Sequence, residues 1–342
     1  MNFTLSHNFS DNNPSATDWN ALLAESVNHV PFLRYEYLRA WWETRGGGEW
    51  PQSSDLMLVT TCRANYLTGI APLFFTNNRD GLPSFMLLGS IEISDYLDII
   101  VRPTDLTEFV RCLFDFLATS SDIPAWRVLD WHNILESSPT LPVLKAEAEA
   151  RGWTFSQERT YHAPAIPLPG DFEIYLSGID KKQRHEIRRK MRRAEEAGNV
   201  RWYIANDAAA LDAEVDAFLS LMANDPAKEK FLTEAMRKQM HSTCRLAFEN
   251  GWLQLAFLEV DGQKAAGYLN FDYQNQIGVY NSGVDRRFLE LSPGWVLLGH
   301  LLEWANTNKR SEFDFLRGDE DYKYRFGAVD RFVVRAKISR EL

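Results

Sequence analysis

The sequence predicts an α/β fold of the α+β kind, with two tandem lobes that each contain a twisted mixed sheet flanked by helices. The chain has 342 residues, 45% of them hydrophobic, which is enough for about two packed cores. Strand patterns occur as antiparallel hairpins among helical patterns, which argues against a doubly wound parallel sheet. A shift of 198 residues places Gly69 on Gly267, each inside the second strand of a hairpin. This match indicates a duplicated lobe, with two unrelated hairpins as the alternative.

The first lobe is predicted over residues 1–162, where helical and strand periodicities follow one another. Three glycines, Gly46 to Gly48, end the second helix. The predicted helices cover residues 16–26, 34–44, 104–118 and 141–151, and the predicted strands cover 56–61, 66–75, 85–88, 96–101, 126–130 and 153–155. The proline-rich residues 163–170 are predicted to form an extended connector between the lobes.

The second lobe is predicted over residues 171–342. Asp261 and Gly262 between two strand patterns indicate a hairpin with a type I′ turn. The predicted helices cover residues 181–193, 208–222, 234–249 and 293–307, and the predicted strands cover 200–204, 252–260, 264–272, 276–284, 313–315 and 332–338. The order of elements repeats the pattern of the first lobe.

The charge of the chain is distributed unevenly. Residues 181–193 contain eight Lys or Arg and one Glu, a net charge of +7. Because the net charge of the whole chain is −10, the remaining residues carry −17. Ile187 and Met191 form a narrow apolar stripe at helical spacing, and Gly198 ends the pattern. The segment is therefore a helix with basic flanks, either a solvated face or an anion site for a phosphate-bearing ligand. The overall acidity opposes non-specific binding to nucleic acid.

Several classes of site and location lack support in the sequence. The three cysteines are far apart and form no CxxC pair, so neither a disulfide framework nor a zinc site is indicated. The seven histidines are scattered, and no metal site is expected. No Gly-x-Ser-x-Gly elbow is present. The N-terminus has no signal-peptide pattern and no apolar run is long enough to cross a membrane, so we expect a cytoplasmic protein.

The most polar segment follows a short strand near the C-terminus. Phe313 and Phe315 alternate with polar residues, and residues 317–325 then bring together Arg, Asp, Glu, Tyr and Lys. A buried strand that ends in such a cluster is typical of a site that binds anions and moves protons. A solvated turn with salt bridges is the alternative.

Four motifs together resemble the CelD-like branch of the GNAT acyltransferases, which are relatives of the FemAB transferases. They are Ser-Asp-Tyr-Leu-Asp at residues 94–98, the basic helix with Arg184 and Arg188, Ser-Pro-Gly at residues 292–294, and the polar cluster at residues 314–323. The resemblance implies two GNAT-like lobes with a cleft between them. It also implies transfer of an acyl group, acetyl or another, from an acyl-CoA to an amine or hydroxyl. The implied acceptor is an anionic small molecule or cell-envelope precursor.

The resemblance places the donor at the start of the helix predicted over residues 293–307. Backbone N–H groups at a helix start bind phosphate, and Pro suits the first turn. Ser292, Gly294, Arg286 and Arg287 are the expected donor-binding residues. The segment departs from the Arg/Gln-x-x-Gly-x-Gly/Ala pattern of the family because it has one glycine. An aminoacyl-tRNA donor, as in Fem relatives, and a non-catalytic binding protein are therefore the alternatives.

Acyl transfer to an amine needs a base and a group that stabilises an oxyanion. Asp319 is the first candidate base and Asp95 the second, although an Asx turn also explains Asp95. By analogy with Fem relatives, Lys323 supplies positive charge to the oxyanion or acceptor, and Arg184 contacts an anionic acceptor. The remaining expected substrate-binding residues are Arg188, Tyr96, Arg317 and Tyr322.

Overall fold

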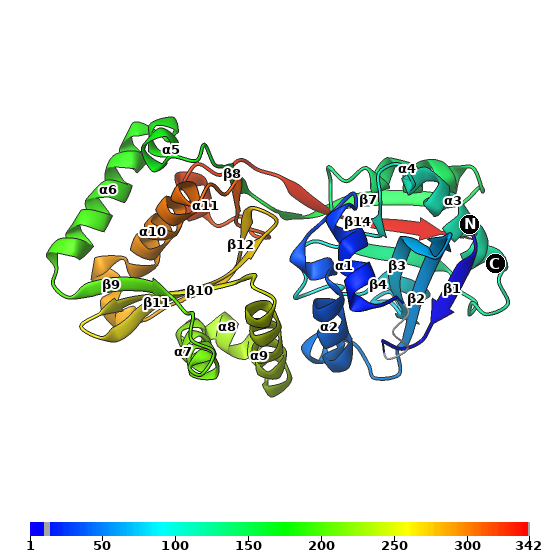
Figure 1. Ribbon diagram of the computed structural model, residues 1–342, viewed down its shortest axis with the longest axis horizontal. Helices are drawn as coiled ribbons and strands as arrows, with labels where there is room; N and C mark the ends of the chain where they lie inside the picture. The colour runs from blue at the N-terminus through cyan, green and yellow to red at the C-terminus, as the bar shows by residue number, and fades with distance from the viewer. Residues whose placement is uncertain (10–13, 341–342) are drawn as a thin grey trace. The chain divides into compact units, whose positions relative to one another are not determined.

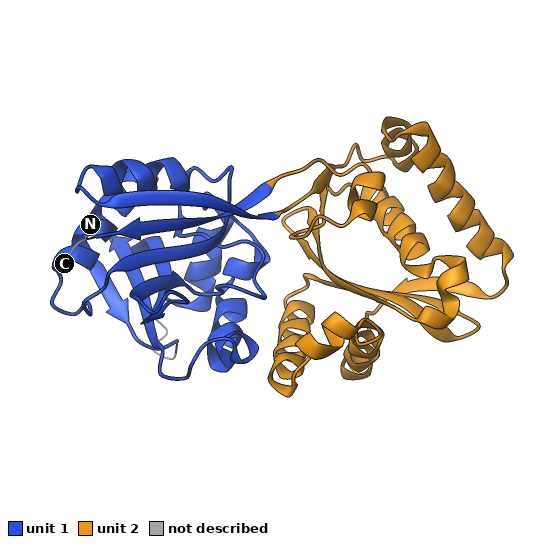
Figure 2. Cartoon of the chain, turned by 180° about the vertical axis from the view of Figure 1, so that it is seen from behind, with its two compact units in different colours: residues 1–161, 332–342 blue, residues 162–331 orange. Residues whose placement is uncertain are grey.

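The computed structural model describes residues 1–9 and 14–340 (Figure 1). The chain folds into two compact units (Figure 2). Unit 1 comprises Met1–Tyr161 and Phe332–Leu342, and unit 2 comprises His162–Arg331. Each unit contains its own mixed sheet with flanking helices, so the predicted fold class and its two lobes are confirmed.

Unit 1 is built on an eight-stranded sheet with the order β1-β2-β3-β4-β6-β14-β7, and β5 pairs with β3. Its strands are β1 (Phe3–Ser6), β2 (Asp55–Arg63), β3 (Tyr66–Asn77), β4 (Pro83–Leu87), β5 (Ile100–Val101), β6 (Val128–Leu135), β7 (Thr154–His162) and β14 (Phe332–Ser339). Its helices are α1 (Ala16–Ala24), η1 (Pro31–Leu33), α2 (Tyr35–Gly48), α3 (Leu106–Thr119) and α4 (Thr140–Glu149). The pairs β1–β2, β2–β3, β3–β4, β3–β5 and β6–β14 are antiparallel, and the pair β4–β6 is parallel.

Unit 2 is built on a six-stranded sheet with the order β8-β13-β12-β11-β10-β9. Its strands are β8 (Ala165–Pro167), β9 (Val200–Ile204), β10 (Leu253–Val260), β11 (Gln263–Tyr273), β12 (Gln276–Val284) and β13 (Glu312–Asp314). Its helices are α5 (Phe172–Gly178), α6 (Lys181–Glu196), α7 (Leu211–Met222), α8 (Pro226–Phe231), α9 (Glu234–Glu249), η2 (Arg286–Leu291), α10 (Pro293–Thr307) and α11 (Asp321–Arg325). The parallel pair here is β12 with β13.

The two units share an order of elements. In each, a first strand is followed by helices, three antiparallel strands, a long helix and a strand parallel to the third of those strands. Gly69 and Gly267 both lie in the second strand of a hairpin, and both allow an aromatic ring to approach the sheet. A Cβ at Gly69 would lie 2.3 Å from Phe109 of α3, and a Cβ at Gly267 would lie 3.0 Å from Phe218 of α7. The predicted duplication therefore has a structural counterpart.

The boundaries of the two units differ from those of the lobes that were predicted at residues 1–162 and 171–342. The last strand, β14, belongs to unit 1, where it pairs antiparallel with β6 from Val333 opposite Leu135 to Ser339 opposite Val128. The predicted connector at 163–170 contains β8, which pairs with β13 of unit 2. Residues 341 and 342, which the second predicted lobe also included, lie outside the described residues.

A second difference concerns the strand predicted over residues 96–101. Only Ile100 and Val101 form a strand. The preceding segment is held as a loop by side chains, because Asn133 donates to the carbonyl oxygens of Ile91 and Ser94 at 2.7 Å each. Sequence periodicity did not indicate β1, β8 or α8.

Candidate functional site

Strands β12 and β13 of unit 2 pair over a short distance and then separate. Their parallel register covers three pairs, from Gln276 with Glu312 to Gly278 with Asp314. Beyond Gly278, β12 continues to Val284 with no strand partner on its β13 side among the described residues. The register of β12 with β11 shifts between Asn281 and Val279, so that Tyr280 is the extra residue of a bulge. We call the open edge of β12 from Val279 to Val284 the splayed edge.

Helices cover the two faces of the sheet at the end of β12. Successive strand residues point to opposite faces. A Cβ at Gly283 would lie 2.5 Å from the backbone of Leu221 and Met222, which places the end of α7 against this residue. A Cβ at Gly294 would lie 2.9 Å from the Val284 side chain, which places the start of α10 on the other face. Figure 1 shows α7 and α8 on one side of the sheet and α10 on the other. The splayed edge is thus bordered by different helices on its two sides.

The loop after β13 is tightly held by Asp314 and Lys323. Leu316 and Gly318 have positive φ angles of 52° and 115°. The Asp314 carboxylate accepts the Leu316 N–H at 2.8 Å and pairs with Arg331 at 2.7 Å. The buried Lys323 ammonium donates to the carbonyl oxygens of Phe315, Arg317 and Gly318 at 3.0–3.3 Å, and lies 2.8 Å from Glu320. Because an ammonium has three N–H groups, these contacts occupy all of them.

Two tyrosines and a glutamate lie beside this loop. Tyr322 of α11 has a pKa above its ordinary value, because burial disfavours the phenolate and Glu320 adds negative charge. Burial raises the pKa of Tyr268 in β11 as well, and both Tyr322 and Glu320 contribute. These hydroxyls therefore stay protonated at neutral pH. By contrast, Asp319, the first candidate base, is exposed to solvent.

A lysine that the sequence analysis did not select lies on the α8 side of the splayed edge. The Lys228 ammonium donates to the Asn281 side-chain oxygen at 2.9 Å and to the Ser282 carbonyl oxygen at 2.6 Å. Burial lowers the pKa of Lys228, while the charges of Asp225 and Glu320 raise it and that of Lys323 lowers it. Through its two hydrogen bonds this lysine connects α8 with β12. No sequence signal marked it, since Ala-Lys-Glu-Lys reads as a solvated helix turn.

The expected donor-binding residues lie between β12 and α10. Helix α10 begins at Pro293, as predicted, and Ser292 at its N-cap has a left-handed backbone with no side-chain cap. Arg287 is paired with Asp285, its Nη2 at 2.6 Å. Arg286 is exposed and lines a cavity with Lys228. The structure thus brings Ser292, Gly294 and Arg286 to the end of the splayed edge.

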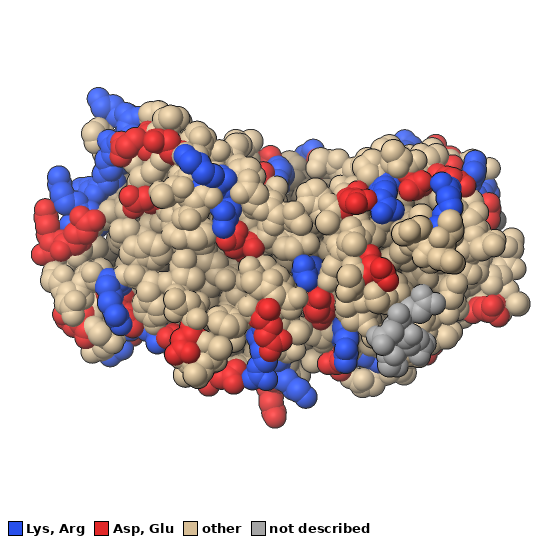
Figure 3. All heavy atoms as spheres, in the orientation of Figure 1, with Lys and Arg blue, Asp and Glu red and all other residues tan. Residues whose placement is uncertain are grey.

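The basic helix α6 lies in the same unit. It begins after Asp180, whose carboxylate accepts the Lys182 and Gln183 N–H groups, and it buries Ile187 and Met191. Arg184 donates to the carbonyl oxygens of Leu176 and Ser177 at the end of α5, and Arg188 pairs with Glu173. The space-filling view shows Lys and Arg side chains gathered over this helix (Figure 3).

The two candidates from the first lobe, Asp95 and Tyr96, lie in unit 1. Both are buried in the loop between β4 and β5. Their assigned roles, like those of Arg184, Arg188 and Arg317, remain predictions. Among residues 1–9 and 14–340, no group of three or more His, Cys, Asp or Glu is placed to hold a metal ion. Within the same residues, no helix is both long and apolar enough to span a membrane.

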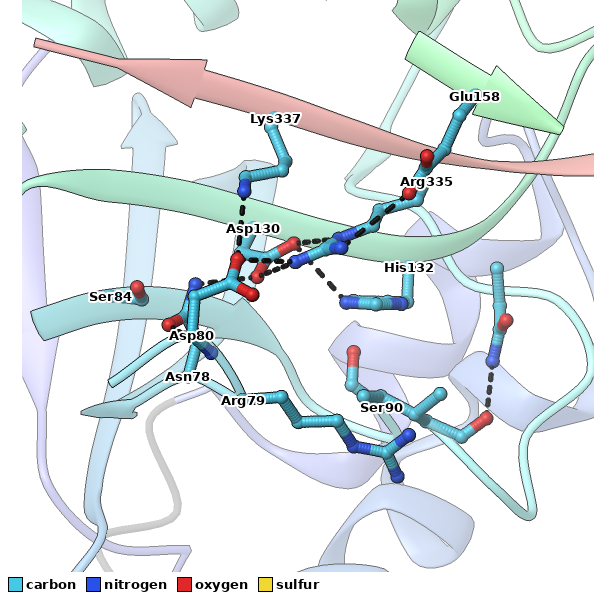
Figure 4. A network of polar contacts seen from close by, with 12 residues as sticks. Asn78, Arg79, Asp80, Ser84, Ser90, Asp130, His132, Glu158, Arg335 and Lys337 are labelled. Atoms are coloured by element: carbon cyan, nitrogen blue, oxygen red, sulfur yellow. Dashed lines mark hydrogen bonds and ion pairs between the residues drawn. The ribbon is translucent and has the colours of Figure 1, made fainter. Parts of the chain in front are cut away.

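Unit 1 has an aspartate at the matching end of its own parallel strand pair. Asp130 of β6 is fully buried, and both its oxygens accept hydrogen bonds from Arg335 of β14 at 2.7 Å (Figure 4). Asn78 and His132 also contact this carboxylate, at 2.8 and 3.2 Å. Burial opposes ionisation of Asp130, but the bonds from Arg335 and His132 outweigh it and hold its pKa below the ordinary value.

The comparisons with known proteins agree with this architecture. Residues 181–324 match the family model of the acetyltransferase (GNAT) domain. No curated protein matches the chain. Among solved structures, FemX has a TM-score of 0.68 at 10% identity, covering 98% of this chain and 97% of that one. A conserved protein of unknown function from Bacteroides thetaiotaomicron VPI-5482 has a TM-score of 0.59 at 11% identity, covering 99% and 100%.

A third similar structure is L-PGS from Bacillus licheniformis, with a TM-score of 0.56 at 11% identity and coverage of 96% and 92%. At these identities the likeness concerns the fold. The matched segment, 181–324, lies inside unit 2 and contains the splayed edge, the start of α10 and the loop after β13. Residues 181–324 are therefore similar to the GNAT-type acetyltransferase domain, and the fold of the chain is similar to that of FemX.

Proposed function

We propose that unit 2 transfers an acyl group from an acyl-CoA to an amine or hydroxyl of a small or precursor-sized anionic acceptor. The observation that supports this most is the splayed edge, where β12 bulges at Tyr280 and leaves β13 after three residue pairs. An exposed strand edge offers backbone N–H and C=O groups to an extended ligand. The pantetheine arm of coenzyme A carries amide groups that suit such an edge.

The proposed donor runs along β12 with its phosphates near the start of α10. The N–H groups of the first turn of this 15-residue helix have no partner within the helix, and the helix dipole favours negative charge there. Ser292 and Gly294 would contact the phosphates, whereas Arg286 lines a cavity with Lys228 on the α7 side of the sheet. Arg287 is less suited to this role, because its guanidinium is already paired with Asp285.

In the proposed reaction the acceptor nitrogen or oxygen attacks the thioester carbonyl carbon. The oxyanion that forms would accept hydrogen bonds from N–H groups of the splayed edge. Collapse of this tetrahedral intermediate then breaks the C–S bond and releases the thiolate. Asp319 is the proposed base that takes the acceptor proton, directly or through water. The protonated hydroxyl of Tyr322 is suited to donate a hydrogen bond near the leaving sulfur, because burial keeps it neutral.

Lys323 and Arg184 have separate proposed roles. The Lys323 ammonium donates its N–H groups to carbonyl oxygens of the loop from Phe315 to Gly318. We therefore propose that Lys323 positions this loop and places a positive charge beside the site. Arg184 would clamp the anionic part of the acceptor. Since such a clamp binds ground and transition states alike, its loss would chiefly raise the acceptor KM.

A second candidate function is transfer from an aminoacyl-tRNA. Helix α6 favours it, because its 16 residues include eight Lys or Arg and three Glu, a net charge of +5. A basic helix of this kind can contact phosphates of RNA. The acidic remainder of the chain opposes it, so acyl-CoA is the preferred donor.

Donor binding tests the proposal. Calorimetry with acetyl-CoA, longer acyl-CoAs and aminoacyl-tRNA should show binding of an acyl-CoA. Gly294→Trp should weaken that binding at least about tenfold, because it adds bulk where the helix start would meet phosphate. Leu289→Trp is the matched control, since Leu289 is 55% exposed in the neighbouring η2 turn. Circular dichroism should confirm that both variants fold.

Three results would count against this proposal. If Gly294→Trp binds acyl-CoA as tightly as the wild type, the donor lies elsewhere. If the wild type binds only aminoacyl-tRNA, the second candidate function is the better one, and if it binds no donor at all, the domain is a non-catalytic binding protein.

A further inference from the structure

A cavity of about 150 Å³ lies between the end of α7, helix α8 and the end of β12. The residues that line it are Leu221, Met222, Asn224, Asp225, Lys228, Ser282, Gly283, Val284 and Arg286. Gly283 makes room for this arrangement, because a side chain there would collide with the backbone of α7. Asn224 closes one end by donating to the Val284 carbonyl oxygen at 3.1 Å. The cavity is thus formed by three fixed elements.

The cavity contains the Lys228 ammonium, whose hydrogen bonds go to neutral oxygens. Lys228 donates two hydrogen bonds to neutral oxygens, those of Asn281 and Ser282, which leaves one of its three N–H groups. The carboxylates of Asp225 and Glu320 favour its charged form through space, but neither forms a direct ion pair with it among the described residues. Burial nevertheless lowers the pKa of Lys228. A desolvated ammonium in this state gains more from an added anion than an exposed one does.

The other charged groups of the cavity are Arg286 and Asp225. The guanidinium of Arg286 adds a second positive charge. The Asp225 carboxylate serves as the N-cap of α8, where one oxygen accepts the N–H groups of Ala227 and Lys228. The three side chains together carry a net charge of +1, and the two cations have the chemistry that binds a carboxylate or phosphate.

The position of the cavity separates it from the proposed donor. Lys228, Leu221 and Met222 lie on the α7 side of the sheet. The start of α10, where the donor phosphates are proposed, contacts Val284 from the opposite face. The Lys228 ammonium donates to Asn281 and Ser282, so it lies at the part of β12 beyond its pairing with β13. An acceptor that entered from the α7 side would meet the thioester at this part of β12.

We infer that Lys228 and Arg286 form a binding subsite for the anionic group, carboxylate or phosphate, of the acceptor. This inference rests on the proposed acyltransferase function and names the acceptor class, a molecule with an anion close to its nucleophilic amine or hydroxyl. Lys228 is then the residue that selects anionic acceptors.

The test uses the full chain with inorganic phosphate and acetate as probes. In the wild type, NMR signals of the Lys228 side-chain ammonium should shift on titration with at least one of the two anions. The anion with the stronger effect indicates whether the subsite prefers phosphate or carboxylate. Lys228→Met should weaken anion binding at least tenfold, Arg286→Gln should weaken it less, and Lys228→Arg should retain it. Lys230→Met is the matched control, because Lys230 is exposed on the same helix and lines no part of the cavity.

Calorimetry with acetyl-CoA distinguishes failure of this inference from failure of the proposed function. Lys228→Met should leave acetyl-CoA affinity unchanged. If Lys228→Met weakens acetyl-CoA and phosphate binding equally, the subsite belongs to the donor and the inference is overturned. It is also overturned if neither anion moves the Lys228 signals, or if Lys230→Met has the same effect as Lys228→Met. Absence of acetyl-CoA binding in the wild type would instead contradict the proposed function.

Discussion

Units 1 and 2 share a topology but differ at the end of their parallel strand pairs. In both units an aspartate lies at this place, and an arginine from later in the chain pairs with it at 2.7 Å, Arg335 with Asp130 and Arg331 with Asp314. In unit 1 the aspartate is fully buried in a polar network. In unit 2 the strands separate just beyond it and leave the splayed edge.

Unit 1 fills the corresponding place with its own chain. Asn133 bonds to the carbonyl oxygens of Ile91 and Ser94, and the Leu97 N–H donates to the Asn133 carbonyl oxygen at 2.8 Å. The Glu49 carboxylate accepts the N–H groups of Ile91 and Glu92 at 3.1 Å. In unit 2, side chains bond to part of the splayed edge: Lys228 and Asn224 donate to the carbonyl oxygens of Ser282 and Val284, and the Asn281 side-chain oxygen accepts the Ser282 N–H. The two units therefore differ in that a loop is bonded beside the strand pair of unit 1, whereas side chains from α8 and the turn before it contact the splayed edge of unit 2.

The largest expected effect comes from breaking the two aspartate–arginine pairs. Arg335→Met should lower the free energy of unfolding by about 3–5 kcal/mol, because it leaves the Asp130 charge buried with too few partners. Arg331→Met should lower it less, since the Arg331 side chain is 31% exposed and Arg335 is 17% exposed. Urea unfolding followed by tryptophan fluorescence measures both. Equal losses would show that the two pairs are equivalent.

The next effect concerns turnover in unit 2. Lys323→Ala should lower kcat by about 10²–10³, because the loop from Phe315 to Gly318 loses its central hydrogen-bond donor, while donor affinity changes little. Asp95→Asn in unit 1 should lower kcat less. Steady-state kinetics with an acceptor found by screening decides this, and Lys323→Arg should restore part of the activity. Full kcat in Lys323→Ala would make this lysine a purely structural partner of Glu320.

The stability of the chain should depend on pH through Asp98, which is buried in the loop of unit 1 between β4 and β5. Burial raises the pKa of Asp98 to about 6, although hydrogen bonds from the Ser138 hydroxyl and the Ile99 N–H oppose this. Between pH about 4 and 6 the folded state therefore binds more protons than the unfolded state, so stability falls as pH rises through this window. The loss attributable to Asp98 is about 3 kcal/mol. In Asp98→Asn this contribution should vanish. Unfolding at pH 4.5 and pH 7 measures it, and an equal slope in variant and wild type would contradict it.

The smallest effect comes from the matched glycines. Adding a methyl group to a packed core destabilises by about 1–3 kcal/mol. Gly69→Ala should be the more destabilising of the pair, because its Cβ would lie 2.3 Å from the Phe109 ring, whereas that of Gly267→Ala would lie 3.0 Å from Phe218. Thermal unfolding of both variants checks this order. The opposite order would show that α3 moves aside more easily than α7.

Local patterns were enough to predict much of unit 2. Helix α10 begins at Pro293 and ends at Thr307 as predicted, and β12 has its predicted bounds. The turn at Asp261 and Gly262 has φ angles of 49° and 76°, which confirms the type I′ prediction. These features depend on residues that are neighbours in sequence. The polar cluster at 314–323 was also found in this way, since it follows a short apolar strand.

The sequence by itself determined the class of fold, the duplicated order of elements, the basic helix and the resemblance to GNAT enzymes, because all of these are carried by periodicity, turn residues and short motifs. Only the tertiary structure decided that β14 returns to unit 1, that the loop at 91–98 is bonded to β6, and that Lys228 meets the splayed edge. Each of these depends on pairing between residues far apart in the chain. Such pairing is selected by the free energy of the whole packed unit, which no local pattern contains.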